Sequence, residues 1–421
     1  MAMPHDGRGH AIHRRAIAAK TLVAAAILAL AAIAAACSAP AEPTIDTSWQ
    51  DPWSSEETGA VARYELPYSD WHSTPWPTDM RRDDDGRLDL SGFPVNRSGA
   101  IDELLADYLD AASTELDGWS IQPTIYVAFD APLDAKQLEQ PAATYDQDGY
   151  FLIDVDPASA EYGWQVPLAS RMTGPDRAQI LAANLLMVQP VWGVPLRPDT
   201  TYAFVLRRDV RDLAGKVLGR PAALAAALDH RFGSSKDALD AKTEALGKSL
   251  EPLALAMEDG IVEINPFDIA AATVFTTGHP TGQLEAMAEV VRDEAAHKPA
   301  YEWKQHQTNS YFYDLFTARY DAPNYQKGVP PYANMGSGGF VFDASGKPVV
   351  QQTESLRVSV AVPKDRYQAV GGKLPVVLYA HGTTGDYLSF TKGGSFKVVE
   401  QLTKRGMVVI GIDQPMHGTR A

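Results

Sequence analysis

Two stretches decide the fold of the last third of the chain: Leu374-Pro-Val-Val-Leu-Tyr-Ala-His-Gly-Thr-Thr-Gly385 and Arg405-Gly-Met-Val-Val-Ile-Gly-Ile-Asp-Gln-Pro-Met-His-Gly-Thr-Arg420. Each contains an apolar run typical of a strand that is buried on both faces of a parallel sheet. Between them, Phe396, Val399 and Leu402 lie on one side of a predicted helix. Strand, glycine-rich turn, helix and strand together predict a βαβ unit, with strands 374–380 and 406–413 side by side and parallel.

The turns after these two strands resemble a known family. The patterns strand-His-Gly-x-x-Gly and strand-Asp-x-Pro-x-His-Gly-x-Arg are similar to strands three and four of α/β-hydrolases, and the loop after strand three of that family supplies one N–H of the oxyanion hole. The resemblance therefore makes this loop the candidate catalytic loop: His381, Gly382, Thr383, Thr384 and Gly385. Glycine suits such a loop because a Cβ would obstruct the approach of a substrate oxygen to a backbone N–H. The competing interpretation is a glycine-rich turn without catalysis.

The residues after the second strand are assigned a structural role, shaping the loop: Asp413, His417, Gly418 and Arg420. The family order of serine, acid and histidine puts all three catalytic residues further along a chain than strand four. No G-x-S-x-G occurs in the 421 residues, and the nearest match, Met335-Gly-Ser-Gly-Gly339, has Met335 in place of the first glycine. We therefore expect nucleophile, acid and base to be absent and the chain to be a fragment, a truncated product or the front half of a split protein.

That expectation has a structural consequence. In the family's strand order 1-2-4-3-5-6-7-8, strand three pairs with strand five, so without strand five Val376, Val377 and Leu378 form an open apolar edge. We expect residues 310–421 to be looser than the part before them. Limited proteolysis tests this, and equal resistance of the two parts would count against it.

The first 37 residues predict a bacterial lipoprotein signal peptide. Arg8, Arg14, Arg15 and Lys20 precede the apolar stretch 21–36, which is too short to span a bilayer comfortably. The small residues 34–36 and Cys37 resemble a lipobox, although Ala34 departs from the usual Leu. This resemblance implies export, lipidation of Cys37 and attachment to the cell envelope, with Ser38 favouring the outer membrane. The alternative is a plain signal peptide or membrane anchor. Residues 38–60 read as a flexible tether.

Residues 61–297 predict a domain that contains a β-sandwich. Leu196-Arg-Pro-Asp-Thr-Thr-Tyr-Ala-Phe-Val-Leu206, followed by a turn at Asp212–Gly215, resembles the Ig-like domains of bacterial surface proteins. Similar modules precede the catalytic domain in surface lipases with a virulence-factor-lipase N-terminal domain, and Leu116-Asp-Gly-Trp-Ser120 is also similar to that group. Residues 221–257 predict two helices inserted into the sandwich, and 269–277 a strand that closes the sheet. The expected fold class is α/β plus all-β, with residues 298–421 forming strands one to four of a hydrolase sheet.

Composition excludes some function classes. The formal net charge of −16 argues against nucleic-acid binding, which needs a cationic face. We expect no cofactor and no metal. The segment Asp83-Asp-Asp-Gly-Arg-Leu-Asp89 has carboxylates that could hold Ca²⁺, but it lacks the bidentate Glu of an EF-hand and is predicted to be a turn. Trp71, His72 and Trp76 are expected to pack in the core.

The leading functional hypothesis, from resemblance, is hydrolysis of carboxylic esters by a lipid-anchored enzyme, through serine acyl-enzyme chemistry. Its partners would be the membrane, through the acyl anchor, and a lipid or other acyl ester as substrate. Two alternatives stay open. One is a non-enzymatic surface lipoprotein that binds or spaces, with a vestigial hydrolase segment, and the other is a hydrolase of a different bond, such as a peptidase.

Overall fold

The computed structural model describes residues 51–53, 56–68, 70–94, 100–138, 149–174, 181–295, 299–306, 310–334, 336–368, 372–393 and 397–420. Cys37, the signal peptide and most of the 38–60 tether lie outside these residues. The chain divides into two compact units, unit 1 (Met1–Pro280) and unit 2 (Thr281–Ala421). The boundary lies before helix α7 (Gly282–Ala295), which the sequence had assigned to the first domain, with a boundary at 297. Helices and several sheets are combined, so the fold class is mixed α and β.

Unit 1 contains three sheets. A four-stranded antiparallel sheet has the order β4-β3-β7-β9, a three-stranded one the order β2-β6-β5, and β1 pairs with β8 in parallel. The strands are β1 (Thr58–Val61), β2 (Ile125–Ala128), β3 (Tyr150–Asp154), β4 (Gln165–Val166), β5 (Leu168–Met172), β6 (Leu185–Pro190), β7 (Thr201–Arg207), β8 (Val217–Gly219) and β9 (Ile269–Thr276). The strand expected over 121–129 is thus shorter, because only 125–128 pair with β6.

The helices of unit 1 are η1 (Asp79–Arg81), α2 (Ala100–Glu115), α3 (Ala135–Leu138), α4 (Ala222–Arg231), α5 (Ala241–Ser249), α6 (Glu251–Glu258) and η2 (Pro266–Asp268). Residues 221–257 form three helices rather than the two predicted. The apolar pattern runs on through Leu250, but the chain turns there, and α6 begins with Pro252 in its first turn, where proline is tolerated.

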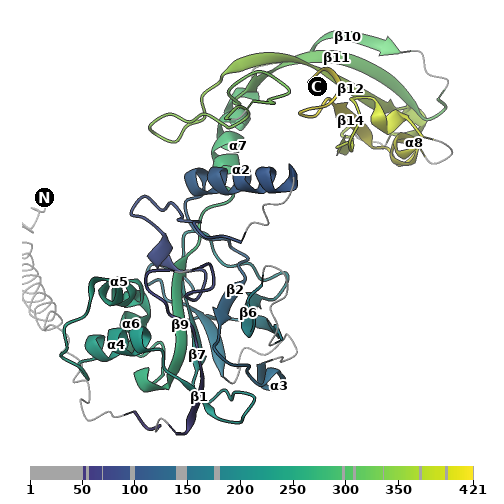
Figure 1. The fold of residues 1–421 in the computed structure, drawn as a ribbon. Coiled ribbons are helices and arrows are strands. Elements are labelled where there is room, and N and C mark those ends of the chain that lie inside the picture. Colours follow the sequence, from purple (N-terminus) through teal and green to yellow (C-terminus); the bar gives the residue numbers. More distant parts are fainter. Residues whose placement is uncertain are drawn as a thin grey trace, which may run out of the picture. The chain divides into compact units, whose positions relative to one another are not determined.

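The central strand β7 explains how unit 1 is layered. Its side chains alternate between two cores: Tyr202, Phe204 and Leu206 belong to a core shared with the three-stranded sheet, whereas Ala203 and Val205 belong to a core shared with α4, α5 and α6. Figure 1 shows these helices on one side of β7 and β9, and β2 and β6 on the other. Trp71, His72 and Trp76 are buried, as expected. Both faces of the four-stranded sheet are therefore covered.

One turn recurs at three places among the described residues, at 83–87, 212–216 and 343–347. In each, the aspartate Oδ1 accepts the backbone N–H groups two and four residues later, at 2.8–3.1 Å. The fourth residue is glycine at φ 84°, 79° and 78°, a conformation that favours glycine. The Asp83–Asp89 segment is thus built around such a turn, and the Asp83 carboxylate is occupied by its own backbone.

Unit 2 is built on a five-stranded sheet with the order β10-β11-β12-β14-β13. Its elements are α7, β10 (Tyr301–His306), β11 (Tyr313–Asn324), β12 (Gln352–Pro363), η3 (Asp365–Tyr367), β13 (Val376–Tyr379), η4 (Ser389–Thr391), α8 (Val398–Thr403), β14 (Val408–Ile412) and η5 (Gly418–Arg420). Strands β10 to β12 and β14 pair antiparallel, and β13 pairs with β14 in parallel, Val376 opposite Val408. The predicted parallel pairing of the two apolar strands is confirmed.

One face of the unit 2 sheet carries the core, and the other is buried in part, with Leu356 and Val358 buried and Val360 half-buried. The core side chains are Tyr313, Leu315, Ala361, Phe390, Val399 and Val409. On the opposite face, the strand register aligns Phe316, Val360, Ile410 and Leu378 in one row. Strand β13 lies at the sheet edge, where Val376 is 60% and Leu378 62% exposed. The open apolar edge expected for β13 is therefore confirmed at Val376 and Leu378, since β13 has a neighbour on one side alone within the described residues. The interpretation of 374–380 as a strand buried on both faces is wrong, because neither of these side chains packs into the core of unit 2.

Candidate functional site

The ends of β13 and β14 bring two loops together. Because the strands are parallel, the segments after both lie at the same edge of the sheet. Gln414 connects them: its side-chain Nε2 donates to the His381 carbonyl at 3.0 Å, and its backbone N–H faces His381 Nε2 at 3.5 Å. The rings of His381 and His417 lie edge to face with centroids 5.0 Å apart. The two motifs singled out from the sequence thus form one cluster.

The 381–385 loop is a tight turn braced by a buried imidazole. The Gly385 N–H donates to the Gly382 carbonyl at 3.0 Å, and Thr384 has φ 67°. His381 is buried, and its Nδ1 lies 3.0 Å from the same carbonyl. Both ring nitrogens of His381 thus face backbone groups of the two loops. A Cβ on Gly385 would lie 2.5 Å from that ring nitrogen, so this position requires glycine.

The backbone N–H groups of the loop are available to a ligand. Gly382, Thr383 and Thr384 are all exposed, and no acceptor among the described residues bonds to their N–H groups. The space where Gly382 would carry a Cβ is open to at least 4 Å. Neighbouring free amides in a turn with a left-handed residue are suited to binding negative charge.

Asp413 directly follows β14 and accepts hydrogen bonds that hold the second loop in place. It is fully buried and accepts hydrogen bonds from Arg357 Nε at 2.7 Å, the Tyr387 N–H at 3.0 Å and Thr419 Oγ1 at 2.9 Å. Burial alone would raise the pKa of this carboxyl, but the bonds from Arg357, Tyr387 and Thr419 outweigh it and leave the pKa below its ordinary value. Asp413 is therefore a buried anion that holds β12, the 386–390 segment and its own loop together.

The other residues assigned to this loop surround Asp413. Gly418 has φ 59°, and a Cβ there would lie 2.2 Å from Asp413 Oδ1. Arg420 forms an ion pair of 2.8 Å with Glu354 of β12. His417 Nδ1 lies 2.9 Å from the Pro415 carbonyl and has no acidic partner within the described residues. Met335 and Cys37 lie outside the described residues.

Sequence reasoning missed Arg357 and Tyr387. Arg357 lies in the apolar strand β12, pairs with Asp413 and stacks over the Tyr387 ring at 4.3 Å. A charged residue inside an apolar strand was the available signal, because a partly buried arginine there needs a carboxylate partner. The position of Tyr387 depends on the close approach of its carbonyl to Gly411, where a Cβ would be 2.4 Å away, and no local pattern shows that contact.

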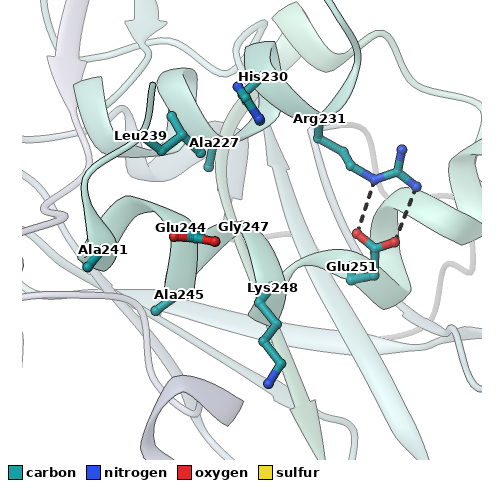
Figure 2. Close-up of a pocket in the computed structure, with 10 residues that line it drawn as sticks. All are labelled: Ala227, His230, Arg231, Leu239, Ala241, Glu244, Ala245, Gly247, Lys248 and Glu251. Atoms are coloured by element: carbon teal, nitrogen blue, oxygen red, sulfur yellow. Dashed lines mark hydrogen bonds and ion pairs between the residues drawn. The ribbon is translucent and has the colours of Figure 1, made fainter. Parts of the chain in front are cut away.

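A separate groove lies in unit 1 between α4, α5 and α6, with a volume of about 690 Å³ (Figure 2). Figure 2 shows short side chains such as Ala227 and Ala245 along it, and Arg231 paired with Glu251 at one end. Arg231 also pairs with Glu258 at 2.7 Å. Its lining contains no serine, threonine or cysteine. It is a groove without a hydroxyl or thiol nucleophile in its lining.

The described residues contain neither a cluster of metal ligands nor a membrane-spanning helix. No group of three or more His, Cys, Asp or Glu side chains there could hold a metal ion. None of the helices in those ranges is both long enough and apolar enough to span a bilayer.

Comparisons with known proteins identify no family. No family model matches the chain, and no curated protein matches it. Among solved structures, the chain is similar to the surface layer protein SbsC, domains 1–6, at 11% sequence identity over 63% of this chain, with a TM-score of 0.18. The match spans about a quarter of that chain's length, 26%. A similarity of this size carries no argument about fold or function.

Proposed function

We propose that unit 2 is the first part of an α/β-hydrolase-type sheet and that its 381–385 loop stabilises the oxyanion formed during hydrolysis of a carboxylic ester. The observation that carries the proposal is the free, exposed N–H groups of Gly382, Thr383 and Thr384, held at the end of β13 beside the loop after β14. The strand order supports it: β11, β12, β14 and β13 follow the 1-2-4-3 order of that family, with β10 as an added edge strand.

The chemistry assigned to this chain is charge stabilisation. A serine hydroxyl would attack the ester carbonyl, and the carbonyl oxygen would become negatively charged as the new C–O bond forms. Loop N–H groups would donate to that oxygen before the alcohol leaves with a proton and water releases the acid. No G-x-S-x-G occurs in the 421 residues, so the proposal assigns to them the stabilisation of charge and not the nucleophile.

The same proposal covers the rest of the chain. Two antiparallel sheets that share one core support an Ig-like module in unit 1, and the apolar stretch before Cys37 supports export and lipid anchoring to the envelope. A lipid or other acyl ester is the substrate class that fits this location.

A first experiment measures p-nitrophenyl ester hydrolysis by the 421-residue chain. We expect no turnover, because the nucleophile motif is missing. Turnover that a serine-directed phosphonate blocks would show that a serine of this chain is the nucleophile, against the proposal. Reading the DNA after codon 421 complements it: a continued frame encoding strand, G-x-S-x-G, helix and a late histidine is expected.

A second experiment tests the loop in the protein from that continued frame. Replacing Thr383 or Gly382 by proline removes one N–H, whereas Thr383→Ala and Gly382→Ala keep it, and the open space beside Gly382 accepts a methyl group. We expect one of the proline variants to lower kcat about 100-fold or more and both alanine variants to stay within about threefold. An inactive parent would refute the function, and active proline variants would refute the role of the loop.

A non-enzymatic binding role is the second candidate, favoured by the groove between α4, α5 and α6. A frame that stops after Ala421, together with no ester turnover, would favour it.

A further inference from the structure

Unit 1 contains a buried arginine without a close ion pair. Arg81, in η1, is 3% exposed, and it forms no ion pair within 4.0 Å among the described residues, although the more distant Asp89 carboxylate interacts with it electrostatically. Its Nη1 donates to the carbonyls of Ser91 at 2.8 Å and Asp89 at 3.4 Å, and its Nε is buried with no partner. Removing a cation from water is costly unless it is paired, so this group calls for an explanation.

The other fully buried arginine of unit 1 shows the usual solution. Arg208 is 1% exposed, and its Nη1 lies 2.7 Å from Asp51 Oδ1, while its Nε donates to the Leu218 carbonyl at 2.8 Å. Arg81 has aromatic rings instead: its Cζ lies 3.9 Å from the Tyr68 centroid and 5.3 Å from that of Trp76. The rings fix the plane of the guanidinium and give it some stabilisation, but they do not neutralise its charge.

Arg81 lines a pocket of about 350 Å³, together with two further arginines, Arg82 and Arg87. Arg82 donates from Nη2 to the Asp117 carbonyl at 3.0 Å, and its Nε is also buried without a partner. Among the residues that the structure describes, neither Arg82 nor Arg87 forms an ion pair. The pocket is thus lined by three cations in a protein whose net charge is −16.

The pocket also contains two carboxylates, each of which accepts backbone N–H groups, and the charge of Asp89 acts on Arg81. Asp83 Oδ1 accepts from the Asp85 and Arg87 N–H groups at 3.0 and 2.8 Å. Asp89 Oδ1 accepts from the Ser91 N–H at 2.9 Å. The lining is completed by Met80, Leu88 and Ser113. Three guanidinium groups with unused N–H donors suit an oxyanion that can accept several charge-assisted bonds at once.

We propose that this pocket binds a small oxyanion of the phosphate class, either free phosphate or the phosphate end of a larger molecule, with Arg81 as the buried anchor and Arg82 and Arg87 as its rim. The proposal does not depend on ester hydrolysis, because the pocket belongs wholly to unit 1.

The test is a calorimetric titration of the 421-residue chain with inorganic phosphate and with phenyl phosphate, at constant ionic strength set by chloride. Tryptophan fluorescence gives a second readout, because Trp71 and Trp76 lie next to Arg81. We expect saturable binding of phosphate, and tighter binding of phenyl phosphate would identify a monoester as the source. No saturable heat with either probe, or stronger binding of benzoate than of phosphate, would overturn the proposal.

Arginine variants inside and outside the pocket distinguish binding at this site from a general effect of positive charge. Arg87→Gln, at an exposed position, is expected to weaken phosphate binding about fivefold, and Arg82→Gln by about tenfold. Arg81→Lys keeps the charge but loses the planar donor edge, and is expected to weaken binding at least tenfold. Arg171→Gln, on β5 and outside this pocket, is the matched control and should leave affinity unchanged. If both the Arg82→Gln and the Arg87→Gln variants bound phosphate as tightly as the wild-type protein, the proposal would be overturned, even if Arg81→Lys fails to fold.

Discussion

Strands β7 and β13 are both apolar, but different elements surround them. Both are short apolar runs, Tyr202-Ala-Phe-Val-Leu206 and Val376-Val-Leu-Tyr379. In β7 every one of these side chains is buried, because a sheet covers one face and helices the other. In β13, Val376 and Leu378 are more than half exposed. Apolar content makes a strand, but the elements packed around it decide how much it stabilises the fold.

The largest expected effect compares one phenylalanine from each unit. Phe204→Ala should cost unit 1 about 4 kcal/mol, because it removes a fully buried ring from a covered sheet. Phe316→Ala, on the half-buried face of unit 2, should cost about 1 kcal/mol. Urea unfolding followed by hydrogen exchange in each unit measures both. Equal losses of stability would mean that the face carrying Phe316 is covered as fully as the face carrying Phe204.

The buried charge of Asp413 is expected to contribute more to the stability of unit 2 than the ring of Phe316 does. Asp413→Asn should cost it about 2 kcal/mol, since Arg357 loses its anionic partner. The pKa of Asp413 is lowered in the fold, so its contribution is present above the ordinary aspartate pKa of about 3.9 and is lost as pH falls through the lower folded value.

Acid titration of unit 2 checks this sign. The wild-type protein should lose stability below about pH 4, and Asp413→Asn should lose less over the same range. The exposed Asp365→Asn serves as control and should stay within about 0.5 kcal/mol of wild type. A variant that loses as much stability as wild type on acidification would contradict the role given to Asp413.

Replacing the glycine of the recurring turn should lower the stability of both units by the same amount. Gly215→Ala and Gly346→Ala each place a methyl group in open space at φ near 80°, so only the backbone conformation is penalised. Each should cost about 1 kcal/mol. Thermal unfolding of each unit measures this, with Ala214→Gly as a control at an ordinary φ. A much larger cost in one unit would show that local rules differ between them.

The smallest effect on stability is expected at the exposed edge. Leu378→Lys should change the stability of unit 2 by less than about 0.5 kcal/mol while lowering self-association, because charge on an edge strand opposes pairing with another chain. Light scattering as a function of concentration measures self-association. Thr353→Lys, exposed on β12, controls for added charge alone. A loss of 2 kcal/mol or more for Leu378→Lys would mean that this edge is covered.

Sequence patterns located most strands and the βαβ segment because their signals are local. Alternation around Tyr202 and the apolar run at Val408 need nothing beyond their own residues to be recognised. The break between α5 and α6 was not foreseen, because it depends on what packs against these helices. The open edge at β13 was expected, but from the resemblance to a family strand order and not from the local pattern, which favoured a strand buried on both faces. Strand β10, with every residue exposed, alternates only at Tyr301 and Trp303, which is too short a pattern to predict a strand.

The candidate loop could be located by pattern, but its details could not. The spacing of His381, Gly382 and Gly385 marks a tight turn. That His381 is buried and faces Gln414 follows from β13 lying beside β14, a contact between residues more than 30 apart. Arg81 is the harder case, because its burial without a close ion pair follows from tertiary packing and leaves no pattern in the local sequence.

The position of β7 between two cores has a mechanical consequence. Since its odd and even side chains serve opposite layers, sliding it by a single residue would move Phe204 from the sheet-facing core to the helix-facing one. Neither layer can therefore release this strand while the other stays intact. Unit 1 should melt in a single cooperative step, and the backbone amides of 202–206 should be the last to exchange with solvent.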